Sequence, residues 1–269
     1  MIIAQLSDMH VSSPDCEFDA LYHTAEKLEI AVKCVNALSP RPGAVVMTGD
    51  LVNNGTAEEY EILKGILDKL EIPAYLGIGN HDCRETFLSS FADEAYLPKD
   101  GFVQYAVDVN GLRLIMLDTN IPGRAQGILC QERLDWLEKT LAEAPDTPTL
   151  IFMHHPPFKT GILAMDNMGL LDAENLGPVI ENHPQILRIF CGHFHRSIQS
   201  NFYGKQAQVC PSTSHTVLLH LENEERLATK AEPAQLLLHI WDGKDDVVTH
   251  NSFIDDYPIM WELEGKIGP

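Results

Sequence analysis

Six short apolar runs lie within the first 190 residues, and each ends at a polar or turn residue. Each run is strand-length and rich in Ile, Val, Leu or Phe, a composition typical of buried strands. The runs cover residues 2–6, 44–47, 74–78, 112–117, 149–153 and 186–190. We therefore predict a domain built around buried β-structure.

Between these runs, apolar residues recur every three or four positions, which is the spacing of an amphipathic helix. This pattern covers residues 21–38, 60–70 and 134–141. Strand and helix thus alternate through about residue 200, which favours an α/β layered fold. Strand-like runs then follow at 206–210, 217–221 and 236–241, before a tail from 249 to 269. We expect a core at 1–202 and, at 203–269, a sheet extension, a cap or an oligomer contact.

The charge balance argues against nucleic acid as a partner. The chain has 39 Asp and Glu against 19 Lys and Arg, a formal net charge of −20. A field of that sign repels phosphate backbones, so we do not expect a nucleic acid partner. We expect the charged stretch 222–230 to be a solvated loop, with a substrate-facing flap as the alternative.

The cysteines give no sign of a disulfide framework or a zinc ribbon. There are six, at positions 16, 34, 83, 130, 191 and 210, and no two form a CxxC pair. We therefore expect a cytoplasmic protein, in which any homo-oligomer is noncovalent. The first apolar run is too short for a membrane span and has no basic region before it, so we expect neither a signal peptide nor a membrane partner.

Five of the six runs lead directly into a short motif that contains metal-binding side chains. In open α/β sheets, ligands collect outside the carboxyl ends of the strands, so these motifs should meet at one edge. The motifs are Ser7-Asp8-Met9-His10, Gly49-Asp50, Gly79-Asn80-His81-Asp82, His154-His155-Pro156 and Gly192-His193-Phe194-His195.

The residue types in these motifs suit divalent cations. The Asp-x-His and His-x-His spacings each place two side chains on the same side of an extended segment. Asp50 has two oxygens that can bridge two cations, and Asn80 offers a neutral oxygen. A set of His, Asp and Asn without cysteine indicates a catalytic site with open positions rather than a structural zinc site.

Together, the motifs resemble those of the calcineurin-like metallophosphoesterase superfamily over residues 2–197. The resemblance is strongest to the class III cyclic nucleotide phosphodiesterases and the bacterial glycerophosphodiesterases. These groups carry S-D-x-H, G-D-x-V-x-x-G, G-N-H-D, M-H-H-P-P and C-G-H-x-H, matched here at 7–10, 49–55, 79–82, 153–157 and 191–195. Asn53-Asn54 and Asp82 depart from the protein phosphatases, and Asn53 replaces the tyrosine typical of purple acid phosphatases.

The resemblance implies a four-layer α/β/β/α sandwich with a small C-terminal β extension and two divalent metal ions. One ion would bind Asp8, His10, Asp50 and His195, and the other Asp50, Asn80, His154 and His193. Asn80 and His81 would contact the phosphate and take part in catalysis, while His215 resembles a further substrate-binding histidine. His155 would be a supporting residue, since adjacent strand side chains face opposite ways, and Asp82 would orient a histidine.

We therefore expect a metal-dependent phosphodiesterase that acts on small phosphodiesters, glycerophosphodiester-like and of broad specificity, through attack by a metal-bound hydroxide. His215 and the long tail favour this substrate class over 3′,5′- or 2′,3′-cyclic nucleotides, which are the alternative. Two further alternatives are a catalytically silent metal-binding protein and a nuclease. Mn, Fe, Zn and Co all suit the donor set, so it does not identify the metal.

Overall fold

Two mixed β-sheets form the centre of the molecule. The computed structural model describes residues 1–14 and 16–262. The first sheet has the order β15-β14-β1-β2-β3, in which β1, β2 and β3 run parallel and β14 pairs antiparallel with both β1 and β15. Its strands are β1 (Ile2–Leu6), β2 (Ala44–Thr48), β3 (Ala74–Gly77), β14 (Gln235–Trp241) and β15 (Val247–Phe253).

The second sheet has the order β10-β11-β9-β7-β5-β4. Its inner strands β11, β9, β7 and β5 are parallel, and each edge strand pairs antiparallel with its neighbour. The strands are β4 (Tyr105–Val109), β5 (Leu112–Leu117), β7 (Thr149–Met153), β9 (Ile186–Cys191), β10 (Ile198–Phe202) and β11 (Lys205–Val209).

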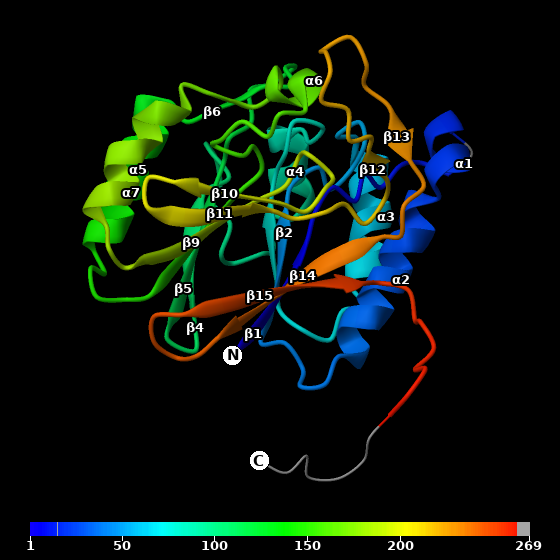
Figure 1. Cartoon of the computed structure of the whole chain (residues 1–269), viewed down its shortest axis with the longest axis horizontal. Helices are drawn as coiled ribbons and strands as arrows, with labels where there is room; N and C mark the ends of the chain where they lie inside the picture. Colours follow the sequence, from blue (N-terminus) through cyan, green and yellow to red (C-terminus); the bar gives the residue numbers. More distant parts are fainter. Residues whose placement is uncertain (15, 263–269) are drawn as a thin grey trace.

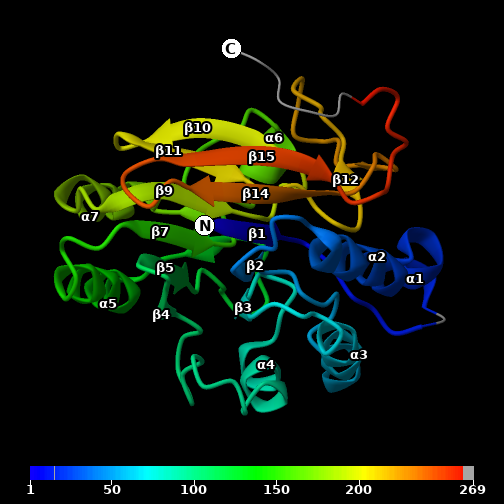
Figure 2. The same ribbon diagram turned by 90° about the horizontal axis from the view of Figure 1, so that it is seen from below.

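Helices cover the outer face of each sheet (Figures 1 and 2). The helices α2 (Thr24–Ala37) and α3 (Ala57–Leu67) pack on the first sheet, and α5 (Gln131–Ala142) and α7 (Gly177–Asn182) on the second. The shorter elements are α1 (Glu17–Tyr22), α4 (Arg84–Ser90), α6 (Leu163–Asp166), the 3₁₀ turn Ala173–Leu176, and the paired strands β6 (Gly127–Ile128) with β8 (Leu170–Leu171) and β12 (Thr216–Val217) with β13 (Thr229–Lys230). No helix in residues 1–14 and 16–262 is both long and apolar enough to cross a bilayer.

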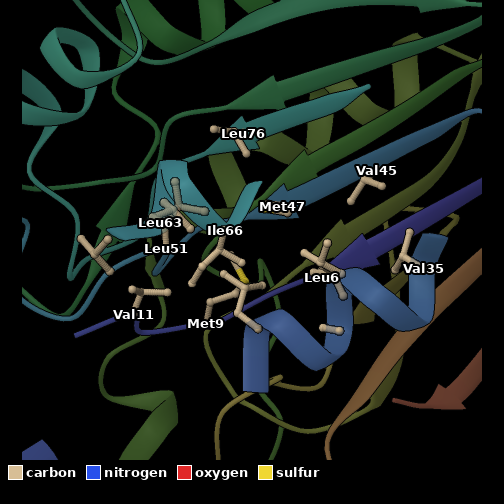
Figure 3. Packing of buried hydrophobic residues seen from close by; sticks show 14 of the residues in the cluster. Leu6, Met9, Val11, Val35, Val45, Met47, Leu51, Leu63, Ile66 and Leu76 are labelled. Atoms are coloured by element: carbon tan, nitrogen blue, oxygen red, sulfur yellow. The ribbon is translucent and has the colours of Figure 1, made fainter. Parts of the chain in front are cut away.

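Three apolar layers separate these four structural layers. Strand β2 shows how the sequence forms them, because alternate side chains face opposite sides of a sheet. Val45 and Met47 pack towards the helices with Leu63 of α3, whereas Ala44 and Val46 pack against the other sheet. Figure 3 shows the helix-facing cluster, in which Leu6, Val45 and Met47 lie beside Val35 and Ile66. The predicted α/β/β/α arrangement is therefore confirmed.

All six predicted strands of the first 190 residues are present, but the later part of the chain needs two corrections. The strand predicted at 217–221 is wrong beyond Val217, since β12 is only Thr216–Val217 and Leu219 and Leu221 are exposed. The tail predicted from residue 249 is also wrong in its first part, because β15 continues to Phe253 and pairs with β14 along its length.

The first predicted helix is interrupted. His23 has a left-handed backbone, φ 51°, that ends α1 and begins α2. The helix predicted to reach residue 70 ends earlier, since α3 is Ala57–Leu67. Its start is fixed by Thr56 and Glu59, whose side chains bond each other's backbone N–H groups in a capping box.

Candidate metal centre

All seven predicted metal ligands lie in loops that follow five parallel strands of the two sheets. Asp8 and His10 follow β1, Asp50 follows β2 and Asn80 follows β3, whereas His154 follows β7 and His193 and His195 follow β9. Six of the seven are buried and Asn80 is half-buried. The fold therefore brings side chains nearly 190 positions apart to one edge.

Five of these residues have a left-handed backbone, which is uncommon for residues other than glycine. They are Asp8, His10, Asp50, His193 and His195, with φ between 46° and 74°. Such backbone costs energy and persists only where surrounding contacts enforce it. Gly49 supports the turn at Asp50: its φ is 94°, and a Cβ there would lie 2.6 Å from the backbone nitrogen of Gly79.

The first group of donors is Asp8, His10, Asp50 and His195, which lie close enough for each to offer a ligand atom to one ion. The Nε2 atoms of His10 and His195 are 3.2 Å apart, and His195 Nε2 is 3.4 Å from Asp8 Oδ1. His10 Nε2 is also 3.6 Å from Asp50 Oδ2. This is the set predicted for the first ion.

The second group contains His154 and His193, with His155 beside them. His154 Nε2 lies 3.1 Å from Asn80 Oδ1 and 3.3 Å from Asp50 Oδ2. One oxygen of Asp50 thus lies between His10 of the first group and His154 of the second, as a bridging carboxylate requires.

Three backbone carbonyls set which imidazole nitrogen each histidine offers. His154 Nδ1 lies 2.8 Å from Thr48 O, His195 Nδ1 2.9 Å from His215 O, and His193 Nε2 2.9 Å from Met168 O. A carbonyl only accepts, so each of these nitrogens carries a proton, and in the neutral ring the opposite nitrogen has the lone pair that can bind a cation. Outer contacts of this kind orient ligand histidines in metal sites.

The electrostatics of the protein alone are unbalanced at this edge. Burial lowers the pKa of His193 to about 3 and that of His10 well below its usual range. For His154, burial also lowers the pKa, but the carboxylates of Asp50 and Asp8 and the carbonyl of Thr48 together outweigh burial and raise the pKa to about 9. In the metal-free protein these buried imidazoles and carboxylates compete for protons. Bound divalent cations would remove this competition, because they accept lone pairs from carboxylates and neutral imidazoles at the same time. The residues present therefore fit a pair of divalent ions, whose identity the donors leave open.

His155 has contacts that agree with its predicted supporting role, which stays a prediction because its ring also lies within reach of an ion shared with His154 and His193. Its Nδ1 lies 2.7 Å from Thr119 Oγ1 and its Nε2 3.1 Å from the carbonyl of Ala125. The prediction for Asp82 is wrong, because its carboxylate bonds no histidine. It accepts from the backbone N–H groups of Gly79 and Leu51 and from the Tyr60 hydroxyl.

His81 and His215 both lie beside the first group. His81 Nδ1 donates to Asn53 O at 2.8 Å, which leaves Nε2 free, and its ring lies 4.6 Å from that of His10. The His215 ring lies 4.4 Å from that of His195 and stacks on Tyr22 at 4.3 Å. Their roles towards a substrate remain predictions.

The end of β5 contributes a scaffold that the sequence reasoning missed. Asp118 accepts from Arg84 Nε at 2.7 Å and from the backbone of Asn120 at 2.9 Å. Asn120 Nδ2 in turn donates to the carbonyls of Gly79 and Asp82, the ends of the loop that carries Asn80. The signal was available, since Asp118-Thr119-Asn120 follows the fourth apolar run, 112–117, the one run that leads into none of the five motifs.

A cavity of about 200 Å³ opens over the donor groups. Sequence reasoning also missed its apolar wall, because the contributing residues are scattered and belong to no motif. The wall is formed by Phe18, Ala125, Met165, Met168, Val217 and Leu227, with Thr229 beside them. In the stretch 222–230, the residues Glu222–Arg226 are exposed, as expected of a solvated loop. The later residues Leu227 and Thr229 line the cavity, as expected of the alternative, a substrate-facing flap.

Comparison with known sequences agrees with this geometry. Residues 1–197 match the family described as calcineurin-like phosphoesterase. The chain is 34% identical to a probable glycerophosphodiester phosphodiesterase GpdQ of Arcobacter nitrofigilis, covering 96% of this chain and 94% of the relative. It is 35% identical to a probable cyclic nucleotide phosphodiesterase of Rhodopseudomonas palustris, covering 88% and 87%.

A solved structure shows the same fold. A dimetal phosphatase of Danio rerio superimposes with a TM-score of 0.72, covering 95% of this chain and 97% of its own at 16% identity. At that identity the likeness concerns the fold alone.

Proposed function

Because the chain belongs to the calcineurin-like phosphoesterase family, we propose that it is a metal-dependent phosphodiesterase for small phosphodiesters. The observation that carries this proposal is the place of Asp50 Oδ2, 3.6 Å from His10 Nε2 and 3.3 Å from His154 Nε2. A carboxylate oxygen between the imidazole nitrogens of two donor groups is suited to join two cations. When bound, such a pair supplies positive charge for the phosphate and lowers the pKa of a water molecule.

The side chains of the chain divide the remaining tasks. Asp8, His10, Asp50 and His195 would hold one ion, and Asp50, Asn80, His154 and His193 the other. His81 Nε2 faces the cavity and is suited to contact the phosphate or give a proton to the departing alcohol. The apolar wall reduces the access of water to this space.

Two divalent ions and two carboxylates also give the site a local charge opposite to that of the protein. Four positive charges against those of Asp8 and Asp50 leave an excess of two, which attracts a phosphodiester monoanion despite the formal net charge of −20.

Among small diesters, we favour an open-chain glycerophosphodiester over a cyclic nucleotide. The two relatives named GpdQ match 96% and 99% of this chain, so the likeness extends well beyond residue 197. His215, which lies in that later part, is adjacent to His195 and lines the cavity. The cyclic nucleotide alternative is supported by relatives that match 79% to 93% of the chain.

A comparison of kcat/KM after Mn reconstitution tests this proposal. The substrates are bis(4-nitrophenyl) phosphate, 4-nitrophenyl phosphate, glycerophosphoethanolamine, and 2′,3′- and 3′,5′-cyclic AMP. We expect the open-chain diester to exceed the cyclic nucleotides by at least about tenfold, roughly 1.4 kcal/mol of transition-state preference. A lead for either cyclic nucleotide would replace the substrate class, and binding of two metals without hydrolysis of any diester would reject the activity.

A further inference from the structure

The cavity over the donor groups has two chemically different sides. The polar side is lined by five of the predicted metal ligands together with His81 and His215, and it would face the phosphate; the five ligands are His10, Asp50, Asn80, His193 and His195. The opposite side is the apolar wall defined above, and Thr229 supplies its one hydroxyl group. A bound diester would therefore place its phosphate on the first side and one of its alcohol groups against the second.

Within the described part of the chain, no Lys, Arg or Glu lines this cavity, and its one Asp is the predicted metal ligand Asp50. Charged side chains on the segments around the cavity form hydrogen bonds to groups other than those that would contact a substrate. Asp166 accepts from Thr160 N at 2.8 Å, Glu224 Oε2 accepts from Asn167 at 2.8 Å, and Arg196 donates to Val217 O at 2.8 Å. Lys27 is likewise fixed to the carbonyl of Ser214.

The lining also limits the size of the group that enters. A volume of about 200 Å³ is below the roughly 300–1,000 Å³ of pockets that enclose drug-sized ligands. It suits one alcohol arm of a diester. A carboxylate or an ammonium on that arm would lose its hydration against the apolar wall without gaining a partner, whereas a hydroxyl could bond Thr229.

From this lining we propose that the enzyme selects phosphodiesters whose alcohol arm inside the cavity is uncharged, so that the phosphate carries the only charge recognised. This inference rests on the proposed function and adds a rule of selection to it. Glyceryl, nucleosidyl and aryl arms satisfy the rule, and arms that end in a carboxylate do not.

Leu227 allows the rule to be tested by a change of preference. Its side chain lines the cavity, yet it is 53% exposed, so Leu227→Lys can add a cation to the wall without filling the core. Leu221→Lys is the matched control, because Leu221 belongs to the same segment, is 56% exposed and does not line the cavity. Both variants change the net charge equally.

The experiment measures kcat/KM of the Mn-loaded full chain on two symmetrical diesters, bis(4-nitrophenyl) phosphate and bis(4-carboxyphenyl) phosphate. In these compounds, either arm that enters the cavity has the same charge. The carboxy-to-nitro ratio is then compared between wild type and variants, so the different reactivities of the leaving groups cancel. We expect Leu227→Lys to raise the ratio at least about tenfold and Leu221→Lys to leave it within about twofold.

An unchanged ratio in Leu227→Lys, or an equal rise in both variants, would overturn the inference, since the second result would show a general field effect. A wild type that hydrolyses neither of the two diesters is a different outcome. It would reject the proposed function, and the inference with it.

Discussion

At the scale of single residues, Asp50 is the side chain on which the predicted centre depends most. One of its oxygens lies between His10 and His154, and the other accepts the backbone N–H of His81 at 2.8 Å. We expect Asp50→Ala to lose both metal ions, with affinity falling by more than the ~100-fold typical of outer contacts. Metal content measured by mass spectrometry after dialysis checks this.

Asn80→Ala is the companion variant, because Asn80 approaches only His154 of the second group. Here we expect loss of one ion of the two. Equal loss of both ions from the Asn80 variant would contradict the assignment of residues to the two ions.

His81 provides a test that separates chemistry from metal binding. Its Nδ1 is held by Asn53 and its Nε2 is free, so the ring can contact a substrate without coordinating an ion. We expect His81→Ala to keep full metal content while kcat falls by about 10²-fold, the usual lower range for a lost general acid. If the variant loses metal in proportion to activity, His81 is a ligand.

At the scale of secondary-structure elements, β14 contains a histidine that the site does not use. His239 lies in the core, where its nitrogens are 3.0 Å from Thr249 Oγ1 of β15 and 3.1 Å from Gln5 Oε1 of β1. Burial, with a smaller effect of Arg188, lowers the pKa of His239 to about 3. The unfolded chain takes up this proton near pH 6.5 and the folded chain does not, so stability present above pH 6.5 is lost as the pH falls towards 3.

We therefore expect the unfolding free energy of the metal-free protein to fall between pH 7.5 and 5, with about 2 kcal/mol of the loss due to His239. In His239→Gln the loss should be smaller by that amount. Urea unfolding at both pH values measures it. His250→Gln, on exposed β15, is the control, and a loss unchanged by His239→Gln would contradict the prediction.

The loop after β5 gives a second prediction at this scale. Asn120 Nδ2 donates to the two carbonyls that bound the Asn80 loop, so Asn120→Asp would place a carboxylate against them. We expect the ion assigned to Asn80 to lose about 10–100-fold in affinity, the usual effect of an outer contact. Mn titration followed by calorimetry measures this. A matched loss at both ions would point to general damage to the fold.

The elements also show what the sequence could predict. Strands β1, β2, β5, β7 and β9 are buried on both faces and so form continuous apolar runs. The edge strands β10 and β15 have mixed sequences, IQSNF and VVTHNSF, and become strands because β11 and β14 supply their hydrogen-bond partners. The hydrophobic pattern of a segment does not show which strand will pair with it.

The same division applies to the site. The seven predicted ligands follow apolar runs in short motifs, because chemistry restricts their identity and spacing, and the structure brings these seven side chains to one edge. The apolar wall was missed, because Phe18, Met165 and Leu227 come from three separate segments and any apolar side chain could serve there.

At the scale of the whole molecule, charge determines which phosphodiesters can approach. A formal net charge of −20 disfavours a polyanionic strand far more than a small monoanion. We expect a fluorescent single-stranded DNA oligonucleotide to show no anisotropy change up to about 100 µM protein in 150 mM salt, where non-specific binders reach Kd values of about 10⁻⁴–10⁻⁶ M. Salt-sensitive binding below that limit would revive the nuclease alternative.

The left-handed backbone at five of the predicted ligands also bears on the history of the chain. Each such residue costs of the order of 1 kcal/mol relative to glycine, which adopts this conformation freely. In a lineage released from the need to bind metal, drift to glycine at these positions would be permitted and would also improve folding. Asp or His at all five positions is therefore costly for the fold alone, and the proposed metal binding would compensate for that cost.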